Sequence, residues 1–406
     1  MNAAPMKNGT PNPESTTRRT KRVLHVFHSL GMGGAEMWLL ALLDWFANPP
    51  YPLAEDVKID VLLTGGERAE LDDRARQLGA RLHYLKYDRH NAVSFVRGFR
   101  KLLNDWTYDA IHDHADYAAG LHLTMGFGLL PPARVVHVHN PFATFEQTPG
   151  RALVRRAERA AVAALATTVA GTSLQILHDY DLAPEGARSG QRRLAIHCGF
   201  DVARYSEDSA AMRASVRAEF GWGADSRILL FVGRLESHFN QKNPELAVAI
   251  ARQCMSRDPR VRAIFAGAGD EARAVFIAET VSNGSAERMK FVGVRNDVPR
   301  LMLASDLLLF PSIAEGLGMV VVEAQAAGLR VLASDTTPRE CEVVPGMVTF
   351  APLAEGGQAW ADRAMSLLAL PKPNASANRE KVRSSPFSID SSARALLEAY
   401  GFAQGS

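Results

Sequence analysis

The feature that most constrains this chain is an alternation, repeated twice, of short apolar runs with helical patterns. In the first half, "RVLHVFHSL" from Arg22 and "ARVVHVHN" from Ala133 are typical of buried strands, and each leads through glycine or polar residues into a helix-like stretch. From Arg227 the alternation begins again with "RILLFVGRL" and "PELAVAIARQCM". The pattern predicts an α/β fold of two Rossmann-like, doubly wound domains that face each other across a cleft.

The expected domain boundaries follow from where this alternation pauses and stops. It pauses between Arg192 and Ser206, and a Pro-rich "LPKPNASANRE" separates it from a terminal helical pattern. We therefore expect a disordered tail over 1–20, a first domain over 21–205, a second domain over 206–385, and a terminal helix with a tail over 386–406. Ligands of open α/β sheets bind at the carboxyl ends of strands, so the motifs at strand ends matter most.

Composition argues against several classes of protein. An apolar content of 47% with 22% charged residues is ordinary for a globular chain, and a net charge of +2 gives no argument for nucleic acid. The first 20 residues lack an apolar core, which is typical of a disordered tail rather than a secretory signal. The longest run of small and apolar residues, 160–171, is about half of the roughly 20 residues that a membrane span needs. Cys198, Cys254 and Cys341 form no CxxC pair, which favours a reducing cytoplasm.

The segment "PSIAEGLGMVVVEAQAAGLRVLASD" from Pro311 holds two glutamates among glycines and apolar residues. A helix is predicted to begin near Gly318 and to end at Gly328, so Glu315 lies in the preceding loop and Glu323 inside the helix. Carboxylates in these places can accept hydrogen bonds from the vicinal hydroxyls of a ribose or a sugar ring. The alternative is that they only complement the helix macrodipole.

The turn between these glutamates suits an anion. Gly316 and Gly318 permit a tight turn and a close approach of the backbone to a ligand. The amides of Leu317, Gly318 and Met319 at the start of the helix would point into the cleft and form an anion site. The segment therefore suits a nucleotide sugar, with amides for the diphosphate and glutamates for hydroxyls.

Two cations follow another strand of the second half. Arg234 comes directly after "FVG", and Lys242 precedes Asn243-Pro244, a predicted N-cap and first helical residue. Arginine offers a fork of donors to phosphate oxygens, and lysine offers a point charge. We expect both to bind a diphosphate; the alternative is a pair of solvated surface cations.

Glycine turns at other strand ends are weaker candidates. The loop with Val292, Gly293 and Arg295 could hold a flat base through backbone contacts, and a plain turn fits equally well. In the first half, "SLGMGGAE" places Gly33 and Gly34 in a loop that faces the cleft. Its spacing is not the G-x-G-x-x-G of a dinucleotide-binding dehydrogenase, and the next strand does not end in an acidic residue, which argues against that class.

Histidines gather at two strands of the first half. His112 and His114, like His137 and His139, have a spacing that places each pair on one face of a strand. Such pairs can bind a metal ion, but no convincing further ligands accompany them, so no metal site is expected. His139, at the end of its strand, is best placed to reach a donor or acceptor sugar. Structural roles are expected for His112 and His137, and His114 fits either role.

A predicted helix from Gly150 carries arginines at helical spacing, namely Arg151, Arg155, Arg156 and Arg159. Most of them fall on one face, which could contact anionic lipid headgroups or the pyrophosphate of an acceptor. A solvated helix face is the alternative.

Together these motifs resemble the retaining glycosyltransferases of family 4, which have the GT-B fold. The resemblance is carried by "GMGGAE", "VVHVHN", "FVGRL" with "QKNPE", "FVGVRNDVP" and "PSIAEGLGMVVVEAQAAG", the last of which matches the E-x7-E pattern of the family. It spans roughly residues 22–402, and "EAQAAGL" and "RNDVP" are most similar to the branch that builds bacterial capsules and exopolysaccharides. "HCGFD" from His197 departs from the Asn-Gly pair that relatives often carry at the interdomain link.

The resemblance implies a role for each candidate. The catalytic group would be Arg234 and Lys242, which bind the donor diphosphate and stabilise its departure, with Glu315 on the transferred sugar and His139 as the active-site histidine. Glu323 would hold the ribose. The rest of the donor site would be the backbone of Gly316, Leu317, Gly318 and Met319 at the phosphates, the Val292 to Arg295 loop at the base, and Gly33 and Gly34 across the cleft. The terminal helix would cross back onto the first domain.

The expected activity is retaining transfer from a nucleoside-diphosphate sugar to a hydroxyl of a saccharide acceptor, free or lipid-linked, in surface or exopolysaccharide synthesis. A UDP-sugar is favoured as donor, with GDP-mannose next. No DxD-type metal motif supplies Mg²⁺ to the donor site, so no metal and no cofactor are expected, and the enzyme would be cytoplasmic or peripheral on the inner face of the membrane. Three alternatives stay open: a sugar-nucleotide epimerase or hydrolase on the same fold, a metal hydrolase built on the histidine pairs, and a nucleotide-sugar binding protein without catalysis.

Overall fold

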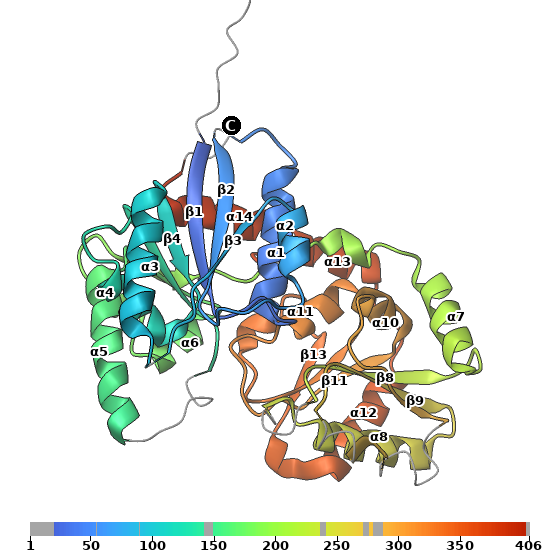
Figure 1. Cartoon of the computed structure of the whole chain (residues 1–406). Coiled ribbons are helices and arrows are strands. Elements are labelled where there is room, and N and C mark those ends of the chain that lie inside the picture. The colour runs from blue at the N-terminus through green and yellow to red at the C-terminus, as the bar shows by residue number, and fades with distance from the viewer. Residues whose placement is uncertain are drawn as a thin grey trace, which may run out of the picture.

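The computed structural model describes residues 20–53, 55–88, 90–141, 149–235, 241–270, 276–278 and 287–402. The expected tail over 1–20 lies outside these ranges, apart from Thr20. Figure 1 shows two α/β units, one from each half of the chain, with a sheet in each. This arrangement confirms the expected pair of Rossmann-like domains. The chain passes from one sheet to the other between Ala195 and Arg227, an interval that contains the expected boundary.

The first sheet has seven parallel strands in the order β3-β2-β1-β4-β5-β6-β7. Its strands are β1 (Thr20–Phe27), β2 (Asp56–Leu63), β3 (Arg81–Tyr84), β4 (Ala110–Asp113), β5 (Ala133–Val138), β6 (Thr168–Gly171) and β7 (Arg192–Ala195). The order reverses beside β1, so β1 and β4 flank the switch point at which doubly wound sheets bind ligands.

The second sheet has six parallel strands in the order β10-β9-β8-β11-β12-β13. They are β8 (Arg227–Val232), β9 (Val261–Ala266), β10 (Met289–Phe291), β11 (Leu307–Phe310), β12 (Val331–Ser334) and β13 (Val348–Ala351). Here β8 and β11 flank the switch point, and the two candidate loops with Lys242 and Glu315 follow these strands.

Helices cover both faces of each sheet. Those of the first half are α1 (Gly34–Ala47), α2 (Asp72–Gln77), α3 (Ala92–Asp105), α4 (Ala119–Met125), α5 (Pro149–Leu165) and α6 (Leu174–Asp179). Those of the second half are α7 (Ser209–Phe220), α8 (Pro244–Arg257), α10 (Val298–Ala304), α11 (Met319–Ala326), α12 (Gly356–Ala369), α13 (Ala375–Arg383) and α14 (Ile389–Tyr400). Single 3₁₀ turns lie at η1 (Asp116–Ala118), η3 (Pro184–Gly186), η4 (Val202–Tyr205), η6 (Arg339–Cys341) and η7 (Leu353–Glu355).

Alternation along the strands builds a separate core on each face. Val23 of β1 packs with α1, α2 and α14, whereas Leu24 packs with α3, α4 and α5 on the opposite face. In the second sheet, Ile228 of β8 faces α10 and α11, and Leu229 faces α8 and α12. Both faces are therefore buried, which is why the strands read as continuous apolar runs.

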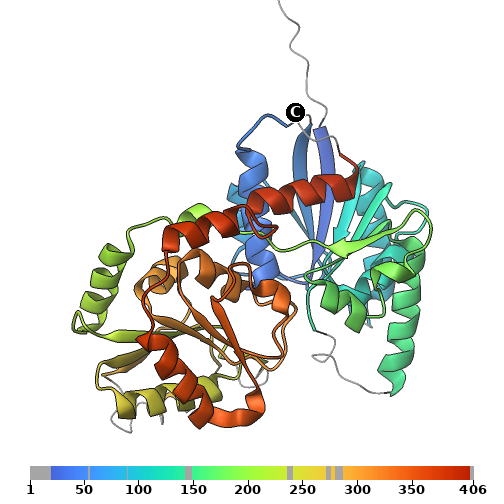
Figure 2. The ribbon, with the colours of Figure 1, turned by 180° about the vertical axis from the view of Figure 1, so that it is seen from behind.

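The C-terminal segment leaves the second domain and joins the first. Figure 2 shows α14, in red, crossing in front of the strands of the first domain, and its Leu396 and Leu397 belong to the same core as Trp38 of α1. Where the chain crosses, it pairs with the outgoing link, because the amide of Phe200 donates to the carbonyl of Phe387 over 3.1 Å. The expected crossing of the terminal helix is confirmed. None of the helices described is both long and apolar enough for a membrane span.

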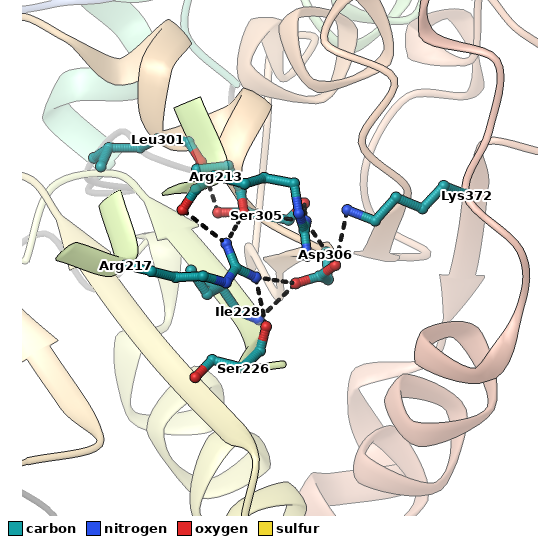
Figure 3. A network of polar contacts seen from close by, with 9 residues as sticks. Arg213, Arg217, Ser226, Ile228, Leu301, Ser305, Asp306 and Lys372 are labelled. Atoms are coloured by element: carbon teal, nitrogen blue, oxygen red, sulfur yellow. Dashed lines mark hydrogen bonds and ion pairs between the residues drawn. The ribbon is translucent and has the colours of Figure 1, made fainter. Parts of the chain in front are cut away.

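A largely buried carboxylate fastens α7 and the chain before α13 to the second sheet (Figure 3). Asp306, next to β11, receives Arg213 Nη1 over 2.9 Å, Lys372 Nζ over 3.1 Å and the amide of Ile228 over 2.8 Å. Arg217 also donates to it over 3.4 Å. Burial alone raises the pKa of Asp306, but Lys372 and Arg213 outweigh it and hold the pKa below its usual range.

Asp306→Asn should lower the free energy of unfolding by roughly 3 kcal/mol, because it leaves the buried Arg217 and the partly buried Arg213 without their counter-charge. The low folded pKa means that the carboxylate stabilises the protein above its unfolded pKa near 3.8 and loses this effect as pH falls through the folded value. Urea unfolding of the variant should therefore depend less on pH below about pH 4.

Glu355→Gln is the matched control, because Glu355 pairs with Arg363 on the surface of the same domain over 2.7 Å. Loss of this exposed pair should cost at most about 1 kcal/mol. Equal losses in the two variants would contradict the role given to Asp306.

Candidate functional site

The strand ends of the two domains meet at Gly316. A Cβ atom on Gly316, after β11, would lie only 2.2 Å from the carbonyl oxygen of His139, after β5. Ser173 Oγ donates to the carbonyl of Gly316 over 2.8 Å, and the amide of Leu174 donates to Glu340 over 3.1 Å. The carboxyl ends of both sheets thus border the same interdomain site, as the sequence predicts.

Lys242 and Glu315 form an ion pair inside this site. Lys242 Nζ lies 2.6 Å from Glu315 Oε1, and the glutamate side chain is only 6% exposed. The same ammonium lies 5.1 Å from the ring centroid of Phe310, which adds a cation–π contact. The two residues come from different loops, so this pair fixes the loop before α8 against the loop before α11.

Gln241 ties the same two loops through the backbone. Its carbonyl accepts the amide of Ile313 over 2.7 Å, and its Nε2 donates to the carbonyl of Ala314 over 2.6 Å. Gln241 was not among the predicted site residues. Its position directly before Lys242 is the only signal in the sequence, and Ala314, to which its side chain donates, lies 73 residues away.

The helix start after Gly318 has the geometry expected of an anion site. Gly318 has φ of 88°, which favours glycine, and α11 begins at Met319. A Cβ on Gly318 would lie 3.1 Å from the ring of Phe310, so the turn is tightly packed. Leu317 turns its side chain into the core, so only its backbone lies at the turn before α11. The amide of Val321 donates to the carbonyl of Gly318 over 2.9 Å, and the amides of Met319 and Val320 before it lie at the start of the helix, where an anion can bind.

Glu323 lies on α11 against the interdomain link. Its Oε2 accepts the hydroxyl of Tyr205 over 3.1 Å. Burial raises the pKa of Glu323, while the hydrogen bond from Tyr205 and the charge of Arg204 lower it in part. Tyr205 was missed in the sequence, where only its place in the linking segment could have indicated a role. A tyrosine held here orients the Glu323 carboxylate, and contact of that carboxylate with a ribose stays a prediction.

The charge of Arg234, in the second domain, acts on Glu36 next to the glycine loop of the first domain. Burial raises the pKa of Glu36 on α1, and the charge of Arg234 from the second domain lowers it in part. Gly33 is the N-cap of α1, and a Cβ on it would lie 2.1 Å from Glu36 Oε2, so the glutamate folds over the loop. Gly34 is exposed. The glycine loop therefore brings a carboxylate to the cleft that the sequence analysis did not select.

The loop from Val292 to Arg295, the candidate for binding a base, offers a ligand its backbone rather than the Arg295 side chain. Arg295 donates to Asp297 over 2.7 Å and to Glu219 of α7 over 3.0 Å, and these bonds raise its pKa. Its guanidinium is thus held by carboxylates of its own domain. Val292 packs against the core, and the carbonyl of Gly293 accepts the amide of Gly267 over 2.8 Å.

His139 is held from two sides. Its amide donates to Asp116 Oδ1 over 2.7 Å, and burial raises the pKa of Asp116 to about 6. Its Nε2 lies 2.9 Å from His114 Nδ1, and its Nδ1 lies 3.8 Å from Cys198 Sγ. Both ring nitrogens therefore face protein atoms, and contact with a sugar stays a prediction.

The arginine helix α5 lies on the flank of the first domain. Arg156 and Arg159, with Arg193 of β7, line a surface pocket of about 580 Å³, and Arg159 pairs there with Asp181. Leu153 and Val154 on the same helix are exposed. The helix thus presents apolar and cationic side chains together, as an interfacial helix does.

Gly316→Ala should force the two domains apart, because its Cβ would overlap the carbonyl of His139. Small-angle X-ray scattering should report a larger radius of gyration than for the unchanged chain. Gly34→Ala is the control, since a Cβ there meets nothing within 4 Å. An unchanged radius in the Gly316 variant would show that this interdomain contact does not hold in solution.

Comparison with known proteins agrees with this geometry. The model described as "Glycosyltransferase Family 4" matches residues 32–204, and "Glycosyl transferases group 1" matches residues 226–369. The putative glycosyltransferase EpsF of Bacillus subtilis is 26% identical over 94% of this chain and 96% of its own length. The capsular polysaccharide biosynthesis glycosyltransferase CapH of Staphylococcus aureus is 22% identical over 77% of this chain and 81% of its own length.

Solved structures share the whole architecture. Anabaena HepE in complex with UDP and glucose has a TM-score of 0.73 at 20% identity, and the match covers 94% of this chain and 99% of that one. WaaG, a glycosyltransferase involved in lipopolysaccharide biosynthesis, has a TM-score of 0.67 at 18% identity, with 94% and 100% covered. These likenesses show the GT-B fold. The two family models, one for each half of the chain, show that it belongs to the glycosyltransferases, with a match to family 4 over residues 32–204 and to group 1 over residues 226–369.

Proposed function

We propose that this glycosyltransferase moves a sugar, with retention, from a nucleoside-diphosphate sugar to a hydroxyl of a saccharide acceptor in surface or exopolysaccharide synthesis. A UDP-sugar is the favoured donor and GDP-mannose the next. The observation that carries the proposal is the buried Lys242–Glu315 pair beside the start of α11, with Glu323 on the same helix. The lysine and the helix amides there suit the diphosphate, Glu315 suits the transferred sugar, and Glu323 suits the ribose.

The comparisons support the substrate class. EpsF and CapH are named for glycosyl transfer, and CapH for capsular polysaccharide synthesis. HepE, which has the same fold, has been solved with UDP and glucose. The acceptor, free or lipid-linked, would enter from the first domain, where His139 and the Gly33 loop border the cleft.

In the proposed reaction the bond between the sugar C1 and the diphosphate oxygen breaks while the acceptor oxygen bonds to C1 on the same face. The acceptor proton passes to the leaving diphosphate. Arg234, Lys242 and the amides of α11 stabilise the charge that develops on that group, and Glu315 positions the sugar. Protein cations take the role that a metal ion has in other transferases, so the transfer is proposed to need no metal.

Contact with the inner face of the membrane is part of the proposal. Its support is α5, where exposed Leu153 and Val154 accompany Arg151, Arg155, Arg156 and Arg159. Such a helix can lie in the headgroup region of an anionic bilayer. The enzyme would then work from the cytoplasm on a lipid-linked acceptor.

Nucleotide binding can be tested by thermal shift with UDP, GDP, ADP and CDP, each with and without EDTA. We expect one nucleotide, UDP first, to raise the unfolding midpoint through mass action, with no effect of EDTA. Glu323→Ala should abolish the shift, because it removes the carboxylate proposed for the ribose. A shift that needs a metal ion, or none with any nucleotide, would refute the proposed donor site.

Arg234→Ala should lower kcat by roughly 10²–10³, as loss of one donor to a developing anion does. Steady-state transfer rates check this, and near-native turnover would show that Arg234 does not stabilise the leaving group. Arg252→Ala on α8 is the control for loss of a cation from the same domain and should keep the rate. Fast consumption of donor without acceptor would instead favour the epimerase or hydrolase alternative.

A further inference from the structure

Five histidines and one tyrosine fill the core between the first sheet and α14. His25 of β1, His112 at β4 and His137 of β5 point to the same face, with His114 and His139 just past the strand ends and Tyr400 at the end of α14. The rings stack closely, with centroids 4.1 Å apart for His112 and His114 and 4.2 Å for His137 and His139. Four of these histidines form the two H-x-H pairs of the sequence, whose spacing alone indicates no joint role for them.

Each of the five rings is neutral. Burial lowers the pKa of His25 and of His139 to about 3, and it lowers the pKa values of the other three well below the usual range. A neutral imidazole has one N–H donor and one lone pair. The rings can therefore form a hydrogen-bonded chain only if every tautomer agrees with the next.

The contacts trace one unbroken chain with Tyr400 in its middle. On one side, Tyr400 Oη lies 3.3 Å from His25 Nε2, His25 Nδ1 lies 3.0 Å from His114 Nε2, and His114 Nδ1 lies 2.9 Å from His139 Nε2. On the other side, Tyr400 Oη lies 2.7 Å from His112 Nδ1, and His112 Nε2 lies 3.2 Å from His137 Nδ1. The chain ends at Cys198 Sγ beside His139 and at the second nitrogen of His137.

A hydrogen-bonded chain of this kind can run in either of two directions, and its two ends favour one of them. At His137, the remaining Nε2 is buried and makes no hydrogen bond with the described residues, while the backbone of Ile196 raises the pKa of this ring and so favours a proton on it. A proton on Nε2 makes Nδ1 an acceptor from His112, which in turn accepts from Tyr400. Tyr400 then accepts from His25, His25 from His114, and His114 from His139 Nε2–H. At the other end, burial keeps the Cys198 thiol protonated by raising its pKa, and the thiol donates to His139 Nδ1.

We propose that this chain fixes the tautomer of His139, with Tyr400 as the positioning residue that joins its two arms. His139 then carries its proton on Nε2 and presents Nδ1 as a lone pair next to Cys198. A thiol is a weak donor and lies 3.8 Å away, so a substrate hydroxyl that enters there is the better partner for Nδ1. This inference rests on the proposed function, since the hydroxyl belongs to the donor sugar or the acceptor.

The location of this end supports a contact with substrate. The charge of Glu36, which folds over the Gly33 loop at the cleft, acts on the Cys198 thiol. The His139 carbonyl next to the ring meets Gly316 of the second domain. A neutral ring at this place accepts a hydrogen bond without removing the proton, which suits a reaction in which the leaving diphosphate takes it.

Histidine tautomers can be read directly from ¹⁵N-labelled protein by long-range proton–nitrogen correlation spectra. In the unchanged chain we expect His139 as a single Nε2–H form. Tyr400→Phe keeps the ring but removes the hydroxyl that accepts from His25 and donates to His112, so His139 should become a mixture of tautomers. In transfer assays kcat should fall about 10-fold, the worth of roughly one hydrogen bond, with the KM for donor unchanged.

Ser392→Ala is the matched control on the same helix. It removes the hydroxyl that accepts from Trp38 Nε1 over 2.9 Å and donates to the carbonyl of His197 over 2.7 Å, outside the chain. Its unfolding midpoint should fall about as much as that of Tyr400→Phe, whereas the His139 tautomer and kcat should stay as they are.

Three outcomes would overturn the proposal. These are a His139 proton on Nδ1 in the unchanged chain, a Tyr400 variant with native tautomers, and a stoichiometric transition metal in the purified protein with metal-shifted nitrogen signals. The last would assign the cluster as a metal centre, to which His114, His137 and His139 bring ligand atoms within 4.8 Å of one another. Absence of transfer with every donor would refute the proposed function instead, and the tautomer spectra would still decide on the chain.

Discussion

The packing of α14 into the core of the first domain is the contact on which the relation between the two domains depends. Leu396, Leu397 and Tyr400 share that core with Trp38, so the last helix is a structural part of the domain that the chain left near Ala195. The outgoing and returning segments pair at Phe200 and Ser388. Two covalent links that run side by side restrict how the domains can separate, and they keep the carboxyl ends of both sheets on the same cleft.

The sequence was sufficient to predict the buried strands and insufficient to predict several strands at the sheet edges. Central strands such as β1, β5, β8 and β11 are covered on both faces, so their apolar runs are unbroken and were recognised. The strands β3, β7 and β13 were not predicted from the sequence, and all three lie at sheet edges. Their residues are mostly half-buried, as in "RLHY" and "RRLA", because one side of an edge strand is exposed, so polar and charged residues interrupt the pattern.

The positions of the candidate site residues could be predicted from the sequence, but the residues with which they pair could not. Strand ends and helix starts are local signals, and they placed Lys242, Glu315 and Glu323 at the cleft. The pairing of Lys242 with Glu315 joins loops 73 residues apart, and that of Tyr205 with Glu323 spans 118 residues. Such contacts depend on how the domains pack. For the same reason the sequence could not show that Arg295 turns to Glu219 on α7 instead of to the cleft.

The charges of the site explain why neutral histidines suit the opposite wall. Glu315 already balances Lys242, so in the proposed donor site a diphosphate would be held by Arg234, by the amides of α11 and by Lys242 as it moves its charge from the carboxylate to the phosphate. That exchange would leave Glu315 able to accept a sugar hydroxyl. A charged imidazole at His139 would compete with these cations for the diphosphate. A buried, uncharged chain of hydrogen bonds avoids the competition and still provides an acceptor of fixed direction at the cleft.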